Sequence, residues 1–289
     1  MSATAIKYYL LFLLLIGANL SQAQNFISSG SIGSFKDAKS FSISPAGYIL
    51  ITDTSSNELI KIDTLGNVIK VIGGYGWQQS TFDNPTDVFA TTLNVYVSDK
   101  NNNRVQFFDK DLNFLSQLAA ENITDSRYVF NYPTCSAVSN QGDLFVLDSD
   151  NNRILKFNIR GEYQVTIGSF DAGSFSLSNP MNFAITRDAK LLVVDPPNII
   201  EFDQFGNGIK KIKFPFVPAN INATTQTITV NSKSQIAIFS NSDFEQGNFD
   251  PIIFSPKLDQ EIMDTFLFGS KLYILTKSSI LIYNYVKSK

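Results

Sequence analysis

A pattern of residues that occurs twice, 49 residues apart, limits what this chain can fold into. The stretch "SDKNNNRVQFFDKDLNFLSQL" begins at Ser98, and "LDSDNNRILKFNIRGEYQVTI" begins at Leu147. Each contains an Asp, a polar run with Asn, an Arg, and then apolar segments separated by a turn. A fixed period of this length is typical of repeat architectures, in which each repeat forms one structural unit.

The period extends along most of the chain. Apolar runs that end in Asp or a small polar residue recur at intervals of 46, 49, 47, 45 and 36 residues, and we interpret each as the second strand of its repeat. These runs end at Asp53, Asp99, Asp148, Asp195, Ser240 and Thr276. The third repeat contains four short apolar runs separated by turn signals, which predicts a four-stranded antiparallel meander.

Composition favours an all-β chain. Of the 289 residues, 25 are Phe and only 17% are charged, and no helical period follows the first two dozen residues. One thin sheet cannot bury both faces, whereas six sheets packed around an axis can, so the sequence predicts a six-bladed β-propeller of four-stranded antiparallel blades. The last repeat has only three predicted strands. Residues 25 to 33 are therefore expected to supply the fourth strand of that blade and to close the ring.

The first 23 residues are typical of a secretory signal peptide. Lys7 precedes an apolar run, and Ser21 and Ala23 have the spacing of a cleavage site. Cleavage near Ala23 would leave a propeller domain over residues 24–289 with no membrane span, and the protein would be secreted or periplasmic. An uncleaved membrane anchor is the alternative, although the apolar run is short for a spanning helix.

Composition also excludes several kinds of chemistry. The chain has no His, which excludes His bases, His-activated nucleophiles and His-ligated metals. Its one cysteine, Cys135, excludes an intramolecular disulfide and is expected to be a small buried thiol. The net charge is −3, or −4 once Lys7 is removed with the leader, so no nucleic-acid partner is expected. No catalytic residue, cofactor or metal site is predicted.

The second and third repeats resemble NHL repeats. The shared residues stand before an apolar strand and are Asp99, Asn102, Arg104, Asp148, Asn151 and Arg153. NHL chains and related six-bladed propellers are mostly binding scaffolds, with some enzymes among them. We expect a structural role for these residues, because the Asp can accept hydrogen bonds from the polar connection and the Arg can pair with a carboxylate. Direct contact with a ligand is the alternative.

Other repeats match less well. The first has Asp53 but Glu58 at the position of the Arg, and the fourth keeps Asp195 and Asn198 with Ile200 at that position. The fifth and sixth keep only the rhythm of the strands. The stretch from Asn241 to Ile262 in the fifth repeat is interpreted either as an irregular blade or as an insertion.

Long aromatic loops between the predicted blades are candidates for a binding face. Phe82, Phe130 and Leu177 stand where a side chain should wedge between blades. Residues farther from the strand starts are candidates for contact with a partner, because exposed aromatic and Arg side chains are favoured at contact surfaces. These candidates are Trp77, Arg127, Tyr128 and Phe170. Packing of each on its own blade is the alternative.

The expected function is a non-catalytic binding or assembly scaffold for a protein or carbohydrate partner. The alternative is a divalent-cation-dependent hydrolase or lactonase, since propellers similar to gluconolactonases hold an ion in the central channel with Glu, Asn and Asp. The sequence offers four Asp at the ends of predicted second strands for that role: Asp53, Asp99, Asp148 and Asp195. The surrounding residues do not match the spacing of that family, so the question of an enzyme stays open with the scaffold favoured.

Overall fold

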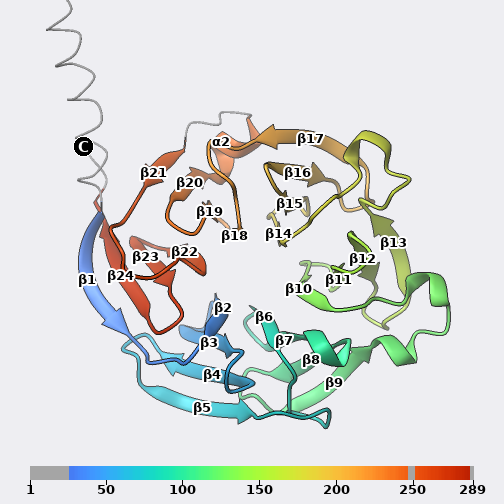
Figure 1. Ribbon diagram of the computed structural model, residues 1–289, viewed down its shortest axis with the longest axis horizontal. Coiled ribbons are helices and arrows are strands. Elements are labelled where there is room, and N and C mark those ends of the chain that lie inside the picture. The colour runs from blue at the N-terminus through green and yellow to red at the C-terminus, as the bar shows by residue number, and fades with distance from the viewer. Residues whose placement is uncertain (1–25, 247–250, 287–289) are drawn as a thin grey trace, which may run out of the picture.

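The computed structural model describes residues 26–246 and 251–286, which form six four-stranded antiparallel sheets around a central axis (Figure 1). The all-β, six-bladed propeller predicted from the period is confirmed. The predicted signal peptide lies outside the described residues.

Each blade is a meander whose strands follow one another from the axis outward. Blades one and two comprise β2 (Ala38–Ile43), β3 (Tyr48–Asp53), β4 (Glu58–Asp63) and β5 (Val68–Gly73), then β6 (Pro85–Ala90), β7 (Asn94–Asp99), β8 (Arg104–Asp109) and β9 (Phe114–Ala119). Blades three and four comprise β10 (Pro133–Val138), β11 (Leu144–Asp148), β12 (Arg153–Phe157) and β13 (Tyr163–Ile167), then β14 (Asn182–Ile185), β15 (Leu191–Asp195), β16 (Asn198–Phe202) and β17 (Gly208–Lys213). Blades five and six comprise β18 (Asn220–Ala223), β19 (Thr227–Asn231), β20 (Ile236–Ser240), α2 (Asn241–Glu245) and β21 (Ile252–Phe254), then β22 (Asp264–Phe268), β23 (Lys271–Leu275), β24 (Ile280–Tyr285) and β1 (Phe26–Ile32).

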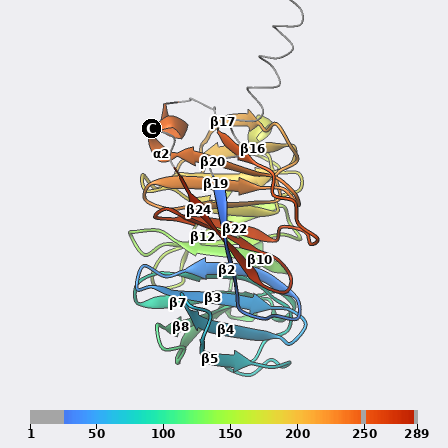
Figure 2. The ribbon, with the colours of Figure 1, turned by 90° about the vertical axis from the view of Figure 1, so that its left-hand side faces the viewer.

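The sixth blade closes the ring with strands from both ends of the described chain. β1 pairs antiparallel with β24, from Phe26 opposite Tyr285 to Ile32 opposite Ile280, as Figure 2 shows where the blue strand lies among red ones. The Phe26 ring stacks on Phe254 of the fifth blade, with ring centroids 4.5 Å apart. The expected completion of the last blade by the N-terminal strand agrees with this sheet.

The core is divided among the six interfaces between neighbouring blades. The described residues form six clusters of buried apolar side chains, one at each interface. Every residue of β11 and β15 is buried, because second strands are covered by neighbouring blades on both faces. The three predicted wedge residues are also buried: Phe82, Phe130 and Leu177.

The fifth blade departs from the sequence prediction. Its second strand is β19, which ends at Asn231, whereas Ser240 ends the third strand. The interpretation of Ser240 as the end of a second strand was therefore wrong, because both strands are buried apolar runs of equal length. The stretch after Ser240 contains α2 and the short β21, so it belongs to an irregular blade.

The repeated motif forms a joint between the second and third strands of a blade. In the second blade, Asp99 Oδ2 accepts a hydrogen bond from Nε of Arg104 at 2.8 Å, and both side chains are buried. The Arg104 guanidinium also donates to the main-chain oxygens of Trp77, Gln78 and Thr81, all in the loop that enters the blade. One Arg therefore fastens a long loop to a strand end.

The third blade repeats the joint. Asp148 accepts from Nε of Arg153 at 2.8 Å and from the Asn151 amide, and Arg153 donates to the main-chain oxygens of Arg127 and Val129. The residue before the Arg, Asn152, has φ of 49°, a left-handed conformation that Asn tolerates better than most residues.

The first and fourth blades build the joint without Arg. Asp53 accepts from the backbone amides of the preceding loop, and Asp195 accepts from Ser178 and Asn179. In the fourth blade the connection is two residues shorter, so Asn198 lies opposite Asp195 in the ladder. The prediction that Ile200 occupies the position of the Arg was therefore wrong, because Asn198 occupies it.

Removing the Phe26 ring should destabilise the closed ring. We expect Phe26→Ala to lower the free energy of unfolding by about 3 kcal/mol, because it leaves a cavity between the last two blades. Ile27→Ala, at a side chain 57% exposed on the same strand, should change it by less than about 0.5 kcal/mol. Urea unfolding measures both, and equal losses would contradict this account of closure.

Removing the Arg104 side chain should also be costly. Arg104→Ala strands the buried Asp99 carboxylate without its partner, and we expect a loss of about 3 kcal/mol or more in unfolding free energy. Arg160→Ala, at an exposed hairpin position, is the matched control and should be nearly neutral. Thermal unfolding followed by circular dichroism checks the pair, and a neutral Arg104→Ala would refute the joint as a stabilising contact.

Candidate functional site

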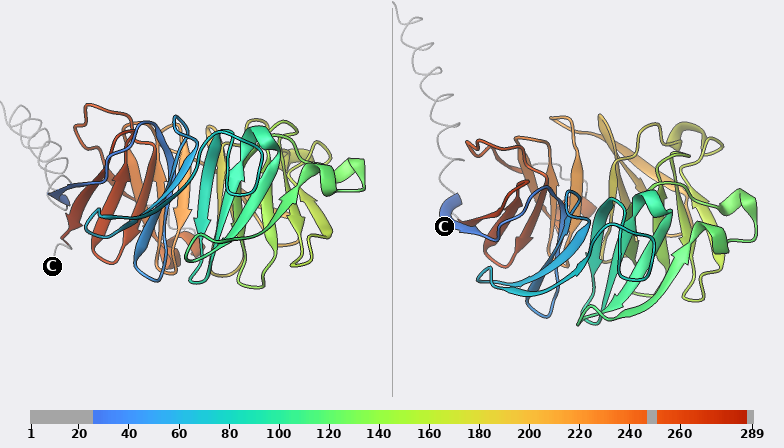
Figure 3. Two further views of the ribbon diagram at one scale, coloured as in Figure 1. Left: turned by 90° about the horizontal axis from the view of Figure 1, so that it is seen from below. Right: turned by 60° about the horizontal axis from the view of Figure 1, so that its bottom comes forward.

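The strands run between two faces of the disc, and each face carries its own kind of connection (Figure 3). One face carries the blade-to-blade loops and the connections from second to third strands, and we call it the loop face. The opposite face carries the hairpins between first and second strands and between third and fourth strands, and we call it the hairpin face. The Asp–Arg joints lie at the loop face.

Two of the three aromatic candidates for partner contact are strongly exposed on the loop face. Trp77 is 73% exposed and Phe170 is 95% exposed, in the loops that enter the second and fourth blades. Tyr75, which the sequence reasoning did not single out, is 71% exposed in the same loop as Trp77. Its signal was available in "GGYGWQQ", two residues before the Trp.

The other two candidates lie in the loop that enters the third blade, and both contact neighbouring side chains. Tyr128 stacks on Tyr163 of β13, with ring centroids 3.4 Å apart and planes within 8°. Arg127 is exposed and pairs with Asp125 through Nη2 at 2.6 Å, with its guanidinium near the Tyr128 ring. The structure therefore places Trp77 and Phe170, but not Tyr128, as unobstructed aromatic surfaces.

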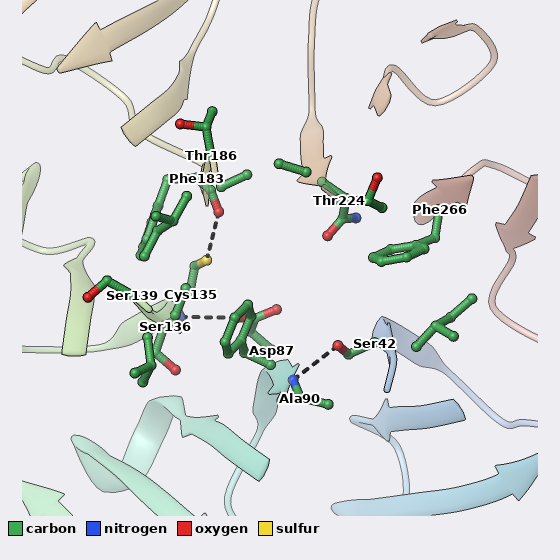
Figure 4. A pocket seen from close by; sticks show the side chains of 18 of the residues that line it. Ser42, Asp87, Ala90, Cys135, Ser136, Ser139, Phe183, Thr186, Thr224 and Phe266 are labelled. Carbon is green, nitrogen blue, oxygen red and sulfur yellow. Dashed lines mark hydrogen bonds between the residues drawn. The ribbon is translucent and has the colours of Figure 1, made fainter. Parts of the chain in front are cut away.

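A cavity of about 360 Å³ occupies the centre of the ring (Figure 4). The inner strands of all six blades line it, and it extends to residues of the hairpin-face turns such as Pro45, Asn140 and Arg187. The Asp residues at the ends of second strands are not among its lining residues. The four carboxylates proposed for a channel ion are instead occupied in the loop-face joints.

A ring of small polar side chains, one from the innermost strand of each blade, surrounds the end of this cavity that is farther from the hairpin-face turns. We call this the inner end of the cavity. We call the ring of side chains the polar ring, and it consists of Ser40, Asp87, Cys135, Asn182, Asn222 and Asp264. All except Ser40 line the cavity. Sequence reasoning missed it, although a polar residue stands 12 or 13 residues before the end of most second-strand runs.

The two carboxylates of the polar ring are buried and held by protein donors. Asp87 accepts from the hydroxyl of Ser40 at 2.8 Å and from the backbone amide of Ser136 at 3.0 Å. Asp264 accepts from the amide of Asn222 at 2.6 Å and from the backbone amide of Thr265 at 2.7 Å. Within the described part of the chain, neither carboxylate forms an ion pair.

Burial dominates the electrostatics of this ring. It raises the pKa of Asp87 above its usual value, and it raises the pKa of Asp264 well above it, with the nearby charge of Asp87 adding to the effect. Burial also raises the pKa of the Cys135 thiol. Cys135 is 3% exposed, as expected for a small buried thiol, and it donates to the Phe183 carbonyl.

The ring fits a calcium ion poorly. Ca²⁺ takes six to eight oxygen ligands and favours several carboxylates. Among residues 26–246 and 251–286 no group of three or more His, Cys, Asp and Glu could hold a metal ion.

The same residues include no helix long and apolar enough to cross a membrane.

Sequence comparison matches part of the chain to a repeat family and to a known protein. Residues 130–157 match the model of the NHL repeat. The chain is 30% identical over 144 residues to the Protein brain tumor of Drosophila melanogaster, a stretch that covers 48% of this chain and 13% of that protein. The chain therefore spans only a small part of that relative's length.

Solved structures of similar fold include both enzymes and a protein complex. A streptogramin B lyase superposes with a TM-score of 0.64 at 13% identity, covering 92% of this chain and 99% of the lyase. A gluconolactonase from Xanthomonas campestris gives 0.66 at 11% identity, covering 90% and 89%. A chain of the nidogen–laminin complex gives 0.57 at 12% identity, covering 78% and 80%. At these identities the likeness concerns the fold, and the chain is accordingly a six-bladed β-propeller that carries an NHL repeat in its third blade.

Proposed function

We propose that the chain is a non-catalytic binding and assembly scaffold that captures a protein partner on its loop face. The observation that carries this proposal is the exposure of Trp77 and Phe170 on the same face of the disc. Large aromatic side chains contribute most of the binding energy at protein interfaces, and exposing them in the free protein is unfavourable. Their presence on one face favours a partner that covers them.

The loops that carry these aromatics are held in place before any partner arrives. The main-chain oxygen of Trp77 accepts a hydrogen bond from the Arg104 guanidinium at 2.7 Å. The main-chain oxygen of Phe170 accepts from the hydroxyl of Ser176 at 3.2 Å. A loop fixed in this way loses little conformational entropy on binding, which strengthens the complex.

Similar propellers support a protein partner over a carbohydrate. One propeller of this fold belongs to the nidogen–laminin complex, so a disc of this shape serves in a protein assembly there. The exposed residues here are apolar and lie on the loops that enter the second and fourth blades, so a partner that contacts both must span the third blade, which suits an extended protein surface. We also propose that the partner is met outside the cytoplasm, because residues 1–23 have the features of a signal peptide.

The alternative of a cation-dependent hydrolase is favoured by the Asp and Asn side chains in the central cavity and by the lyase and lactonase folds. Its weakness is the ligand set, since Asp87 and Asp264 are the only carboxylates among the described residues that line the cavity.

Partner capture should depend on the loop face. Placing the photo-crosslinker p-benzoylphenylalanine at Phe170 should yield a discrete crosslinked protein in the native compartment, because this position would lie inside the interface. The same crosslinker at Phe205, which is 67% exposed on the hairpin face, is the matched control and should yield none. Trp77→Ala combined with Phe170→Ala should weaken capture of that partner by at least about tenfold without lowering the melting temperature. Crosslinking only from Phe205 would place the interface on the opposite face.

The effect of calcium on the melting temperature should distinguish the scaffold hypothesis from the hydrolase hypothesis. We expect no change in the melting temperature of the purified chain in millimolar CaCl₂, because a ligand stabilises a fold only when it binds the folded state. Differential scanning fluorimetry measures the shift, with MgCl₂ at equal ionic strength as the control. A rise of several degrees with CaCl₂ alone, abolished by Asp264→Asn, would favour the hydrolase.

A further inference from the structure

We propose that the inner end of the central cavity binds a small organic ammonium ion, with the apolar body of the ligand directed toward the hairpin face. This site is separate from the loop face and does not rest on the proposed scaffold function.

The first observation is a pair of buried carboxyl groups without a cationic partner. Asp87 and Asp264 are 7% and 2% exposed, and within the described residues neither is paired with Lys or Arg. The one cationic side chain among the described lining residues, Arg187, is exposed at a hairpin-face turn. Burial without a counter-charge disfavours the ionised form of a carboxyl group, so a cation that enters this end of the cavity would stabilise that form and be held by it.

The second observation is an excess of acceptors. Asp87 accepts hydrogen bonds from Ser40 and Ser136 and also lies beside the Cys135 thiol, a weak donor, and the Val88 amide. Its strong donors are therefore fewer than the lone pairs of a carboxylate. Asn182 Oδ1, at the same level of the fourth blade, is buried and accepts no hydrogen bond from the described residues. A primary ammonium group has three donors and no acceptor, and therefore matches this end of the cavity.

The third observation is an apolar wall that lies next to the two carboxyl groups on the side of the hairpin face. Phe89 follows Asp87 by two residues on β6, and Phe266 follows Asp264 by two residues on β22. Residues two apart on a strand point to the same side, so both strands present a carboxylate at the inner end and an aromatic ring nearer the hairpin face. Both rings are half-buried and line the cavity, and Figure 4 shows Phe266 beside it.

These features together favour an organic cation over a metal ion. The cavity volume of about 360 Å³ lies in the range of small-molecule sites. Aromatic walls bind apolar groups and attract ammonium ions through their faces, but they offer nothing to a hydrated metal ion. The ligand class is therefore a primary amine, protonated at neutral pH, with an aromatic or branched aliphatic body.

Isothermal titration calorimetry with phenethylammonium chloride tests the site on the purified chain. We expect saturable one-to-one binding that is at least about tenfold stronger than binding of the neutral isostere phenethyl alcohol, because hydrogen bonds to charged groups are the stronger kind. Asp87→Asn and Asp264→Asn, which keep the shape of the side chain, should each weaken it by about tenfold. Asp150→Asn, at an exposed position on the loop face, is the matched control and should leave it unchanged.

Protection of the Cys135 thiol by the bound amine is a second test, and it uses the unaltered chain. Cys135 is the one thiol of the chain and lines the cavity, so bound phenethylammonium should slow its reaction with methyl methanethiosulfonate, as followed by mass spectrometry. Equal protection by phenethyl alcohol, or no protection at saturating amine, would overturn the proposal. Stronger protection by CaCl₂ than by the amine would overturn it in favour of a metal site.

Discussion

Mutual burial of thin sheets is the constraint on which this structure depends. A four-stranded blade has two apolar faces and can bury them only against other blades, so the blades must form a ring with no open end. The six interblade clusters are the result, and the pairing of β1 with β24 removes the last exposed edge. Every other feature, including the central cavity and the two faces, follows from this circular arrangement.

The ring also explains why polar residues occur on the innermost strands. Each of these strands has one edge facing the axis, where its backbone groups lack a partner strand. Side chains from the neighbouring blade supply some of the missing partners: Asp87 accepts from the Ser136 amide, and the Ser42 hydroxyl accepts from the Ala90 amide. Since a hydroxyl suffices in the first blade, two buried carboxylates exceed what the backbone requires. These two carboxyl groups distinguish the cavity from a purely structural channel.

The long connections on the loop face are held by side chains of the repeated motif. On the loop face, buried Asp–Arg pairs fasten long blade-to-blade loops to strand ends, and the aromatic side chains of those loops stand in defined positions. The motif that identifies the repeat therefore acts through the loops it anchors. A binding surface at the loop face and a ligand cavity reaching the hairpin face can coexist, because Trp77 and Phe170 are not among the residues that line the cavity.

The sequence by itself determined the architecture, because strand and turn patterns repeat locally and a fixed period leaves few ways to bury the sheets. It predicted the all-β ring of six blades, the last strand taken from the N-terminal part, and the buried wedges such as Phe82 and Phe130. It failed in the fifth blade, where β19 and β20 are both short apolar runs, and at Asn198, where the connection is shorter than in the other blades. Only the tertiary structure decided the polar ring, the pairing of Tyr128 with Tyr163 and the exposure of Phe170. Asp87 and Asp264 are far apart in the chain and line the same cavity only because the ring is closed, so no local pattern could have revealed their proximity.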